Sequence, residues 1–164
     1  MNKQTAILAA GCFWGVQAYF DQVPGVMETE VGYTGGHTKN PTYDQVCQHD
    51  TGHAEAVKID FDANKISYKD ILRQFFRMHD PTQVDGQGPD IGDNYRSAIF
   101  YINDDQKNVA EQVKAMVQKD FKVPLATEIT KASEFYRAEE YHQKYTEKTG
   151  LGACHVPYSE LPRL

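Results

Sequence analysis

Cysteine is scarce in this chain, since only three of its 164 residues, Cys12, Cys47 and Cys154, are of this type. An odd and sparse set of cysteines does not suit a secreted domain held together by disulfides. We therefore expect a reducing, cytoplasmic location. Internal repeats, low-complexity segments and linkers are also lacking, so we expect residues 1–164 to form a single domain.

Long apolar runs and blocks of basic residues are absent as well. No uncharged apolar stretch approaches the roughly 20 residues that span a bilayer, and residues 6–11 are shorter than the roughly 7 to 15 residues of a signal-peptide core. We expect no membrane association and an N-terminus that belongs to the mature protein. The formal net charge is −6, with Lys and Arg scattered along the chain, which argues against nucleic acid as a partner.

Hydrophobic periodicity predicts the order of strands and helices. Buried or alternating segments predict strands at 5–10, 28–34, 55–61, 97–102 and 125–130. Apolar residues at helical spacing predict helices at 14–22, from Ser67 and beyond Asn103. The order strand, helix, strand, strand, helix, strand is typical of a split βαβ core. We therefore predict an α+β fold, a two-layer sandwich with a ferredoxin-like core, helices on one face of the sheet and a long irregular C-terminal segment.

Two segments do not fit regular structure. Residues 79–96 hold three Gly and two Pro in 18 positions, and the last fifteen residues are similarly irregular. Long loops in a compact domain are usually either functional or disordered. The first segment contains Asp90 and Tyr95, and the second contains Cys154. We expect residues 146–164 to form a mobile C-terminal tail.

Cys12 lies where the first predicted strand ends and the first predicted helix begins, in AILAAGCFWGVQAYF. The unpaired backbone N–H groups and the positive dipole end of a helix N-terminus favour a thiolate over a thiol. A thiolate here would be a nucleophile. A free cysteine can equally be a small buried hydrophobic residue, and position alone leaves both interpretations open. The adjacent Phe13 and Trp14 do not distinguish a nucleophile from a buried structural cysteine, because paired aromatic residues are common in cores.

Seven short motifs follow one another along the chain. They are GCFWG (11–15), VGYTGG (31–36), NPTYDQVC (40–47), TGHAEAV (51–57), HDPTQ (79–83), DIGDNYRSAIF (90–100) and AEEYHQKY (138–145). In all seven the chain resembles the type A methionine sulfoxide reductases, and the resemblance covers about residues 6–155. One such motif would be weak, but seven in the same order are specific.

The resemblance implies a catalytic site in which Cys12 is the nucleophile and Glu55 is the acid. It also implies that Phe13 and Trp14 form the apolar wall that receives the S-methyl group of the substrate. A sulfoxide sulfur is electrophilic, but its oxygen leaves only after protonation, so a thiolate and a proton donor must converge on the S–O bond. Glu55 must then stay protonated near neutral pH, which requires apolar or anionic neighbours. Without the resemblance, Glu55 would be read as a solvated residue of an edge strand.

The same resemblance implies that the sulfoxide oxygen or its ordered water is bound by Tyr43, Asp90 and Tyr95. Tyrosine hydroxyls can donate to a developing oxyanion without carrying charge. The chain has ten tyrosines, so their abundance gives no independent support. The resemblance further implies selectivity for the S epimer, because exchanging methyl and oxygen would bury the oxygen against Trp14.

His49, His53 and His79 could suggest a metal site together with Cys47. None of these residues shows a recognised ligand spacing such as CxxC or HExxH. We therefore predict no metal ion and treat the three histidines as structural or hydrogen-bonding residues. Cys47 follows the apolar Val46, and we expect it to be a buried structural thiol.

The predicted function is thiol-dependent reduction of methionine sulfoxide, free or in oxidised proteins, by a single catalytic domain. The reaction leaves a sulfenic acid on Cys12. Attack by Cys154 then gives an intramolecular disulfide, which thioredoxin or a small dithiol opens as external reductant. We expect no bound cofactor and a monomeric enzyme.

Two other classes of function stay open. One is a peroxide-reducing thiol enzyme. Such an enzyme would need no methyl pocket, and Trp14 beside the thiol argues instead for a carbon-bearing substrate. The other is a noncatalytic module that binds methionine-rich peptides through the aromatic pair. Incubation with a dithiol and either hydrogen peroxide or methionine sulfoxide separates them, since a binding module turns over neither compound.

One equivalent of methionine sulfoxide should produce a Cys12–Cys154 disulfide, because a mobile tail can bring the two Cα atoms within roughly 7 Å. Cys154→Ser should release a single equivalent of methionine, accumulate sulfenic acid at Cys12, and lose turnover with thioredoxin while keeping turnover with a small dithiol. Peptide mapping by mass spectrometry after one turnover checks the linkage. A Cys12–Cys47 linkage, or full thioredoxin-supported activity in the variant, would contradict the assignment.

Overall fold

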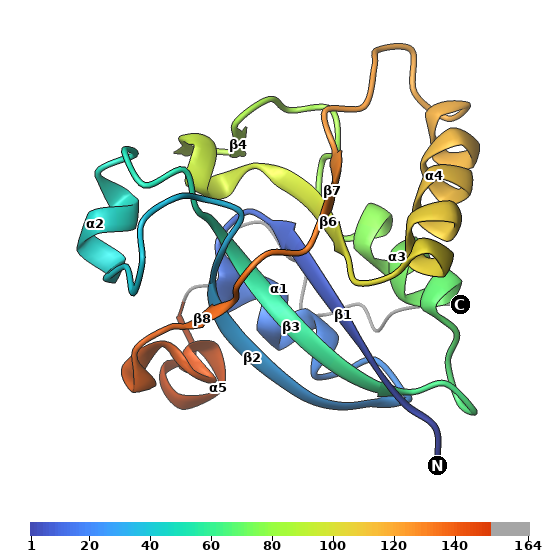
Figure 1. Ribbon diagram of the computed structural model, residues 1–164, viewed down its shortest axis with the longest axis horizontal. Helices are drawn as coiled ribbons and strands as arrows, with labels where there is room; N and C mark the ends of the chain where they lie inside the picture. The colour runs from blue at the N-terminus through green and yellow to red at the C-terminus, as the bar shows by residue number, and fades with distance from the viewer. Residues whose placement is uncertain (152–164) are drawn as a thin grey trace.

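The computed structural model describes residues 1–151, so Cys154 and most of the predicted tail lie outside the described residues. The strands of its main sheet are β1 (Lys3–Ala10), β2 (Val26–Thr34), β3 (Ala54–Asp62), β6 (Ser97–Tyr101), β7 (Glu128–Lys131) and β8 (Tyr136–Arg137). They lie in the order β7-β6-β1-β3-β2-β8 (Figure 1). Neighbouring strands are antiparallel, except for β6 and β7, which are parallel. The fold is therefore a mixed α/β fold built on a central sheet.

Several helices contribute side chains to a core on one face of this sheet. The helices are α1 (Phe13–Phe20), α2 (Tyr43–Cys47), α3 (Tyr68–Arg77), α4 (Asp104–Gln118) and α5 (Tyr145–Thr149). Leu8 of β1 shares the main hydrophobic core with side chains of α1, α3 and α4. Ile7 points to the opposite face and belongs to a smaller cluster, which Ala132 and Phe135 cover. These two residues come from the chain between β7 and β8, which crosses in front of the sheet in Figure 1.

Local capping signals explain where two of the helices begin. The Ser67 hydroxyl accepts a hydrogen bond from the Asp70 backbone N–H at 3.1 Å, at the start of α3. The Asn103 side chain accepts one from the Gln106 backbone N–H at 2.9 Å, at the start of α4. Each cap of this kind stabilises a helix by about 1 kcal/mol. Both helices therefore begin where the sequence predicts.

Other elements differ from the expectations. The first helix begins and ends earlier than the predicted 14–22, and the predicted strand 125–130 forms later, as β7. The irregular segment 79–96 contains the short hairpin β4 (Gly86–Gln87) and β5 (Asp90–Ile91), followed by the 3₁₀ turn η1 (Asp93–Tyr95). The predicted tail begins inside α5, which follows a second 3₁₀ turn, η2 (Glu140–His142). Within residues 1–151, no helix is both long and apolar enough to cross a membrane.

Candidate active site

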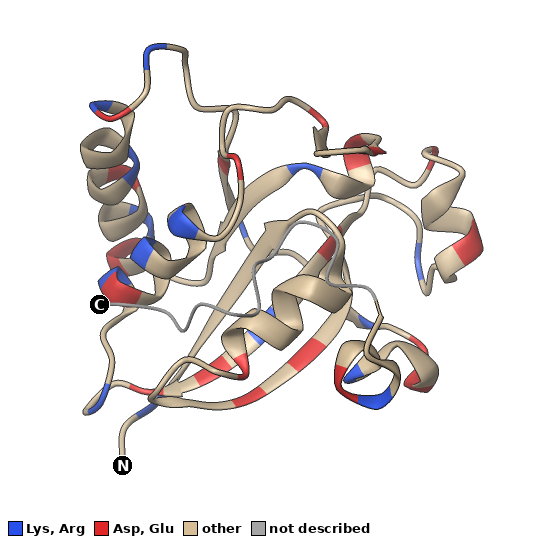
Figure 2. Cartoon of the chain, turned by 180° about the vertical axis from the view of Figure 1, so that it is seen from behind, with Lys and Arg blue, Asp and Glu red and all other residues tan. Residues whose placement is uncertain are grey.

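Cys12 lies at the junction between β1 and α1. Gly11 before it has a φ of +93°, which glycine adopts without strain, and the chain turns there from the strand into the helix. Cys12 is the N-cap residue of α1, yet its side chain caps no backbone N–H, and it is only 7% exposed. α1 itself carries no charged side chain (Figure 2). The helix dipole therefore supplies positive potential beside the sulfur.

Glu55 lies on β3, on the helix-covered face of the sheet, and is only 1% exposed. Its Oε1 accepts a hydrogen bond from the Phe13 backbone N–H at 3.3 Å, and its Oε2 accepts one from the Asn94 side-chain amide at 3.4 Å. Burial raises the pKa of Glu55 to about 8, and the charge of Asp90 also raises it, whereas the two donors lower it. The carboxyl is therefore largely protonated at neutral pH. Since β3 lies between β1 and β2, Glu55 is no solvated edge residue.

Tyr43 and Tyr95 approach the carboxyl of Glu55 from two different elements, α2 and η1. Burial raises the pKa of both hydroxyls, and the charge of Glu55 raises it further. Both tyrosines therefore remain neutral hydrogen-bond donors. Asp90, on β5, is half-buried, and its Oδ2 atom is buried without a hydrogen-bond partner among the described residues. The structure thus brings the predicted oxygen-binding residues together with the predicted acid.

Cys47 differs from the expectation of a buried thiol. It is half-buried, and burial raises the pKa of its thiol, whereas the nearby side chains of Tyr43 and Tyr95 lower it. The expectation was wrong because it rested on the neighbouring Val46. Val46 is fully buried, but consecutive residues of a helix point in different directions.

Aromatic side chains form the wall beside Cys12. Trp14 stacks on Tyr145 with ring centroids 4.0 Å apart, and its indole N–H donates to His142 Nδ1 at 2.9 Å. The ring of Phe13 lies 5.3 Å from His142 and 6.4 Å from Tyr43. Burial lowers the pKa of His142, so its ring is neutral. Because an indole N–H can only donate, Nδ1 accepts and the ring proton sits on Nε2.

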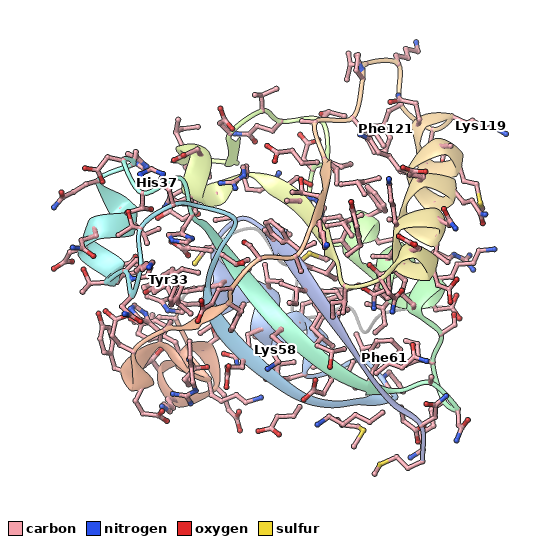
Figure 3. All side chains as sticks on the ribbon, in the orientation of Figure 1. Tyr33, His37, Lys58, Phe61, Lys119 and Phe121 are labelled. Carbon is pink, nitrogen blue, oxygen red and sulfur yellow. The ribbon has the colours of Figure 1, made fainter. Side chains whose placement is uncertain are left out.

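Glu139 fastens α2 to the sheet beside this wall. One carboxylate oxygen accepts a hydrogen bond from the Tyr33 hydroxyl at 2.8 Å, and the other accepts one from the Tyr43 backbone N–H at 3.1 Å. Tyr33 stands opposite Glu55 in the pairing of β2 with β3, and Figure 3 shows it at the end of the sheet that faces α2. The position of Tyr43 is therefore fixed by a contact between distant parts of the chain.

Several of these residues were not singled out from the sequence. Glu139, His142 and Tyr145 all belong to the AEEYHQKY motif, and Asn94 belongs to DIGDNYRSAIF. The motifs indicated the family, but no local feature of the sequence shows which residues within each motif face the site. Cys47 likewise closes the NPTYDQVC motif.

The three histidines considered as metal ligands have other surroundings. His53 and His79 are buried and use both ring nitrogens in hydrogen bonds within the protein. His49 lies 3.8 Å from a carboxylate oxygen of Asp93. In the part of the chain that the structure describes, no group of three or more His, Cys, Asp or Glu could hold a metal ion.

A cysteine at a helix N-terminus, a buried carboxyl with a raised pKa and neighbouring aromatic rings on a mixed α/β fold are consistent with an oxidoreductase. A family model described as peptide methionine sulfoxide reductase matches residues 4–162. The chain belongs to this family. Its activity is therefore the reduction of methionine sulfoxide.

Curated relatives and solved structures agree with this assignment. The peptide methionine sulfoxide reductase MsrA of Methanosarcina mazei is 55% identical over 150 residues, which are 90% of this chain and 71% of the relative. That of Acidobacterium capsulatum is 49% identical over 92% of this chain and 98% of the relative. The reduced form of Mxr1 from Saccharomyces cerevisiae has a TM-score of 0.88 at 33% identity and covers 92% of this chain and 88% of that one. Methionine sulfoxide reductase A of Corynebacterium diphtheriae has a TM-score of 0.82 at 32% identity, with 95% and 84% covered.

Glu55 should make the stability of the protein depend on pH. Its pKa is about 8 in the folded chain against 4.5 in the unfolded chain, so between these values the folded state binds more protons and stability falls as pH rises. The loss is about 3–5 kcal/mol. Glu55→Gln cannot ionise and should lose this part of the dependence. Urea denaturation at about pH 5 and pH 9 measures it, and an unchanged pH dependence in the variant would contradict a buried, titrating Glu55.

Proposed function

We propose that the chain reduces the S epimer of methionine sulfoxide, free or within proteins, with Cys12 as nucleophile and Glu55 as acid. The observation that carries the proposal is the 3.3 Å hydrogen bond between the Phe13 backbone N–H and Glu55 Oε1. It ties a protonated, buried carboxyl to the residue that directly follows the thiol. A nucleophile and a proton donor therefore share one enclosed site.

The first step transfers two electrons from the thiol to the sulfoxide. The sulfur of Cys12 attacks the sulfoxide sulfur while Glu55 protonates the sulfoxide oxygen, and the neutral hydroxyls of Tyr43 and Tyr95 donate hydrogen bonds to that oxygen. The S–O bond of the substrate breaks and the thioether is released. In the net balance one oxygen atom passes from the substrate to Cys12, which becomes a sulfenic acid.

Selectivity follows from the fixed positions of apolar and polar groups. Phe13 and Trp14 offer an apolar surface to the methyl group, while the hydroxyls and carboxyls lie on the side of Glu55. The opposite epimer would place its oxygen against the aromatic rings, where it loses its hydrogen bonds.

The second stage regenerates the thiol. Cys154 attacks the sulfenic sulfur and displaces water, giving a disulfide that an external dithiol reduces by exchange. We assign this role to thioredoxin. The yeast protein Mxr1 has been solved in complex with Trx2, at 23% identity to this chain and a TM-score of 0.64, and that complex supports a reductant of the same kind here.

The central strands also fit the core expected from the sequence. The order β6-β1-β3-β2, with each neighbouring pair antiparallel, supports assignment to a split βαβ, ferredoxin-like arrangement. In this arrangement β1 leads directly into α1, which carries the nucleophile at its start.

The roles of Cys12 and Glu55 can be tested in a single turnover. Cys12→Ser should abolish methionine formation, because a hydroxyl is far less nucleophilic than a thiolate at neutral pH. Glu55→Gln should slow it roughly 100- to 10,000-fold, the usual effect of losing a positioned proton donor. Rapid-quench measurement of methionine from the pure S epimer gives both rates. Turnover above background in Cys12→Ser, or an unchanged rate in Glu55→Gln, would move the role to another residue.

Trp14→Ala should raise the Michaelis constant and weaken the preference for the S epimer, because the methyl wall is lost. The steady-state constants for each separated epimer, with a small dithiol as reductant, measure both effects. Tyr101→Ala removes an aromatic ring on β6, outside the predicted site, and serves as control. Full affinity together with full selectivity in Trp14→Ala would rule out this wall as the methyl site.

A further inference from the structure

Asn94 contacts the predicted acid from a fully buried position. It is 0% exposed, its side-chain amide N–H donates to Glu55 Oε2 at 3.4 Å, and its Oδ1 is buried without a hydrogen-bond partner among residues 1–151. We propose that Asn94 is a positioning residue that holds Glu55 and stabilises the carboxylate left after Glu55 has given up its proton. This inference rests on the proposed role of Glu55 as acid.

The two hydrogen bonds to Glu55 are matched to its two oxygens. Oε1 accepts from the Phe13 backbone N–H and Oε2 accepts from Asn94, at 3.3 Å and 3.4 Å. Both distances exceed the roughly 2.7–3.2 Å that is usual for N–H···O hydrogen bonds. Hydrogen bonds to an ionised group are shorter and stronger. Both bonds therefore strengthen as the proton leaves, and an interaction that strengthens on the way to the transition state lowers the barrier.

The surroundings of Glu55 make these donors important. The titratable groups that interact with its charge come from several neighbouring elements; they are Tyr33 on β2, Tyr43 and Cys47 on α2, Asp90 on β5 and Tyr95 on η1. Within residues 1–151, none of the groups that interact with Glu55 in this way is a cation. The negative charge of Asp90 disfavours a second negative charge on Glu55. The carboxylate of Glu55 must therefore be stabilised by neutral donors.

The unpartnered carbonyl oxygen argues that Asn94 is not placed there for stability. A buried amide oxygen without a partner destabilises the folded state. An apolar side chain of the same shape would remove that unsatisfied atom. Replacing Asn94 should therefore reduce activity more than stability, as at sites where function is kept at the expense of stability.

Asn94→Leu and Gln74→Met provide a matched pair of variants, since each replaces a fully buried amide by an apolar side chain of similar shape. The Gln74 amide accepts a hydrogen bond from the Tyr19 hydroxyl at 2.8 Å, between α3 and α1 and outside the predicted site. We expect Asn94→Leu to lower the melting temperature less than Gln74→Met does. The first variant deprives Glu55 Oε2 of a long hydrogen bond but also removes an unsatisfied buried oxygen, whereas the second leaves the Tyr19 hydroxyl without its acceptor and removes no unsatisfied atom.

The single-turnover rate of methionine formation, measured from about pH 6 to 10, provides the functional readout. The rate should fall at alkaline pH as Glu55 ionises, and this alkaline limb should vanish in Glu55→Gln. Because the Asn94 donor favours the charged form, its removal should move the limb to higher pH and lower the plateau rate about 10- to 100-fold. Gln74→Met should change neither.

The inference would be overturned if Asn94→Leu formed methionine more slowly while the alkaline limb of its pH profile stayed in place. An unchanged rate of methionine formation would overturn it as well. Asn94→Asp keeps the shape of the side chain and gives a second test if the leucine variant fails to fold. Two carboxyls that share a proton lose the last one at higher pH, so the limb should again move upward, and an unmoved limb would overturn the inference too. If Glu55→Gln keeps the full rate, the proposed acid has failed, which is a different outcome from the failure of Asn94 alone.

Discussion

The hydrogen bond between the Phe13 backbone N–H and Glu55 Oε1 depends on the register of the central sheet. The pairing of β1 with β3 runs as far as Leu8 opposite Val57. Continued by two residues on each strand, it brings Ala10 level with Glu55, immediately before the turn into α1. A slip of one residue would turn the Glu55 side chain to the other face of the sheet. The distance between Phe13 and Glu55 is therefore set by strand pairing, not by flexible loops.

The same apolar surroundings serve two purposes at the site. Burial raises the pKa of Glu55 to about 8, so this carboxyl holds its proton at neutral pH. The aromatic rings of Phe13 and Trp14 form the apolar surface that we propose for the methyl group of the substrate. Burial likewise raises the pKa of Tyr43 and Tyr95, which keeps these hydroxyls able to donate. A more polar pocket would weaken substrate recognition and proton donation together. The oxygens of Asp90 and Asn94 that lack hydrogen-bond partners within the described residues lower the stability of the folded protein.

Local signals in the sequence predicted the parts of the fold that local interactions determine. The junction at Cys12 and the helix starts at Ser67 and Asn103 depend on residues within a few positions of each other. Alternation along β3 places Glu55 on the same face as Val57, Ile59 and Phe61. It does not tell a central strand from an edge strand, so the complete burial of Glu55 could not be predicted from it. The contact between Asn94 and Glu55 joins residues 39 positions apart. Such contacts follow from the packing of the whole domain.

The segment between α3 and β6 is irregular and yet holds its shape through its own hydrogen bonds. Gln87 is 2% exposed, and its Oε1 accepts a hydrogen bond from the Asp80 backbone N–H at 2.9 Å. The Gly92 backbone N–H donates to the Asp85 carbonyl at 2.8 Å, just before η1. Hydrogen bonds of this kind restrain the conformation of the loop. The side chains of Asp90 on β5 and of Asn94 and Tyr95 on η1 are therefore oriented before any substrate binds. Hydrogen-bond donors that need no reorganisation during a reaction stabilise developing charge most effectively.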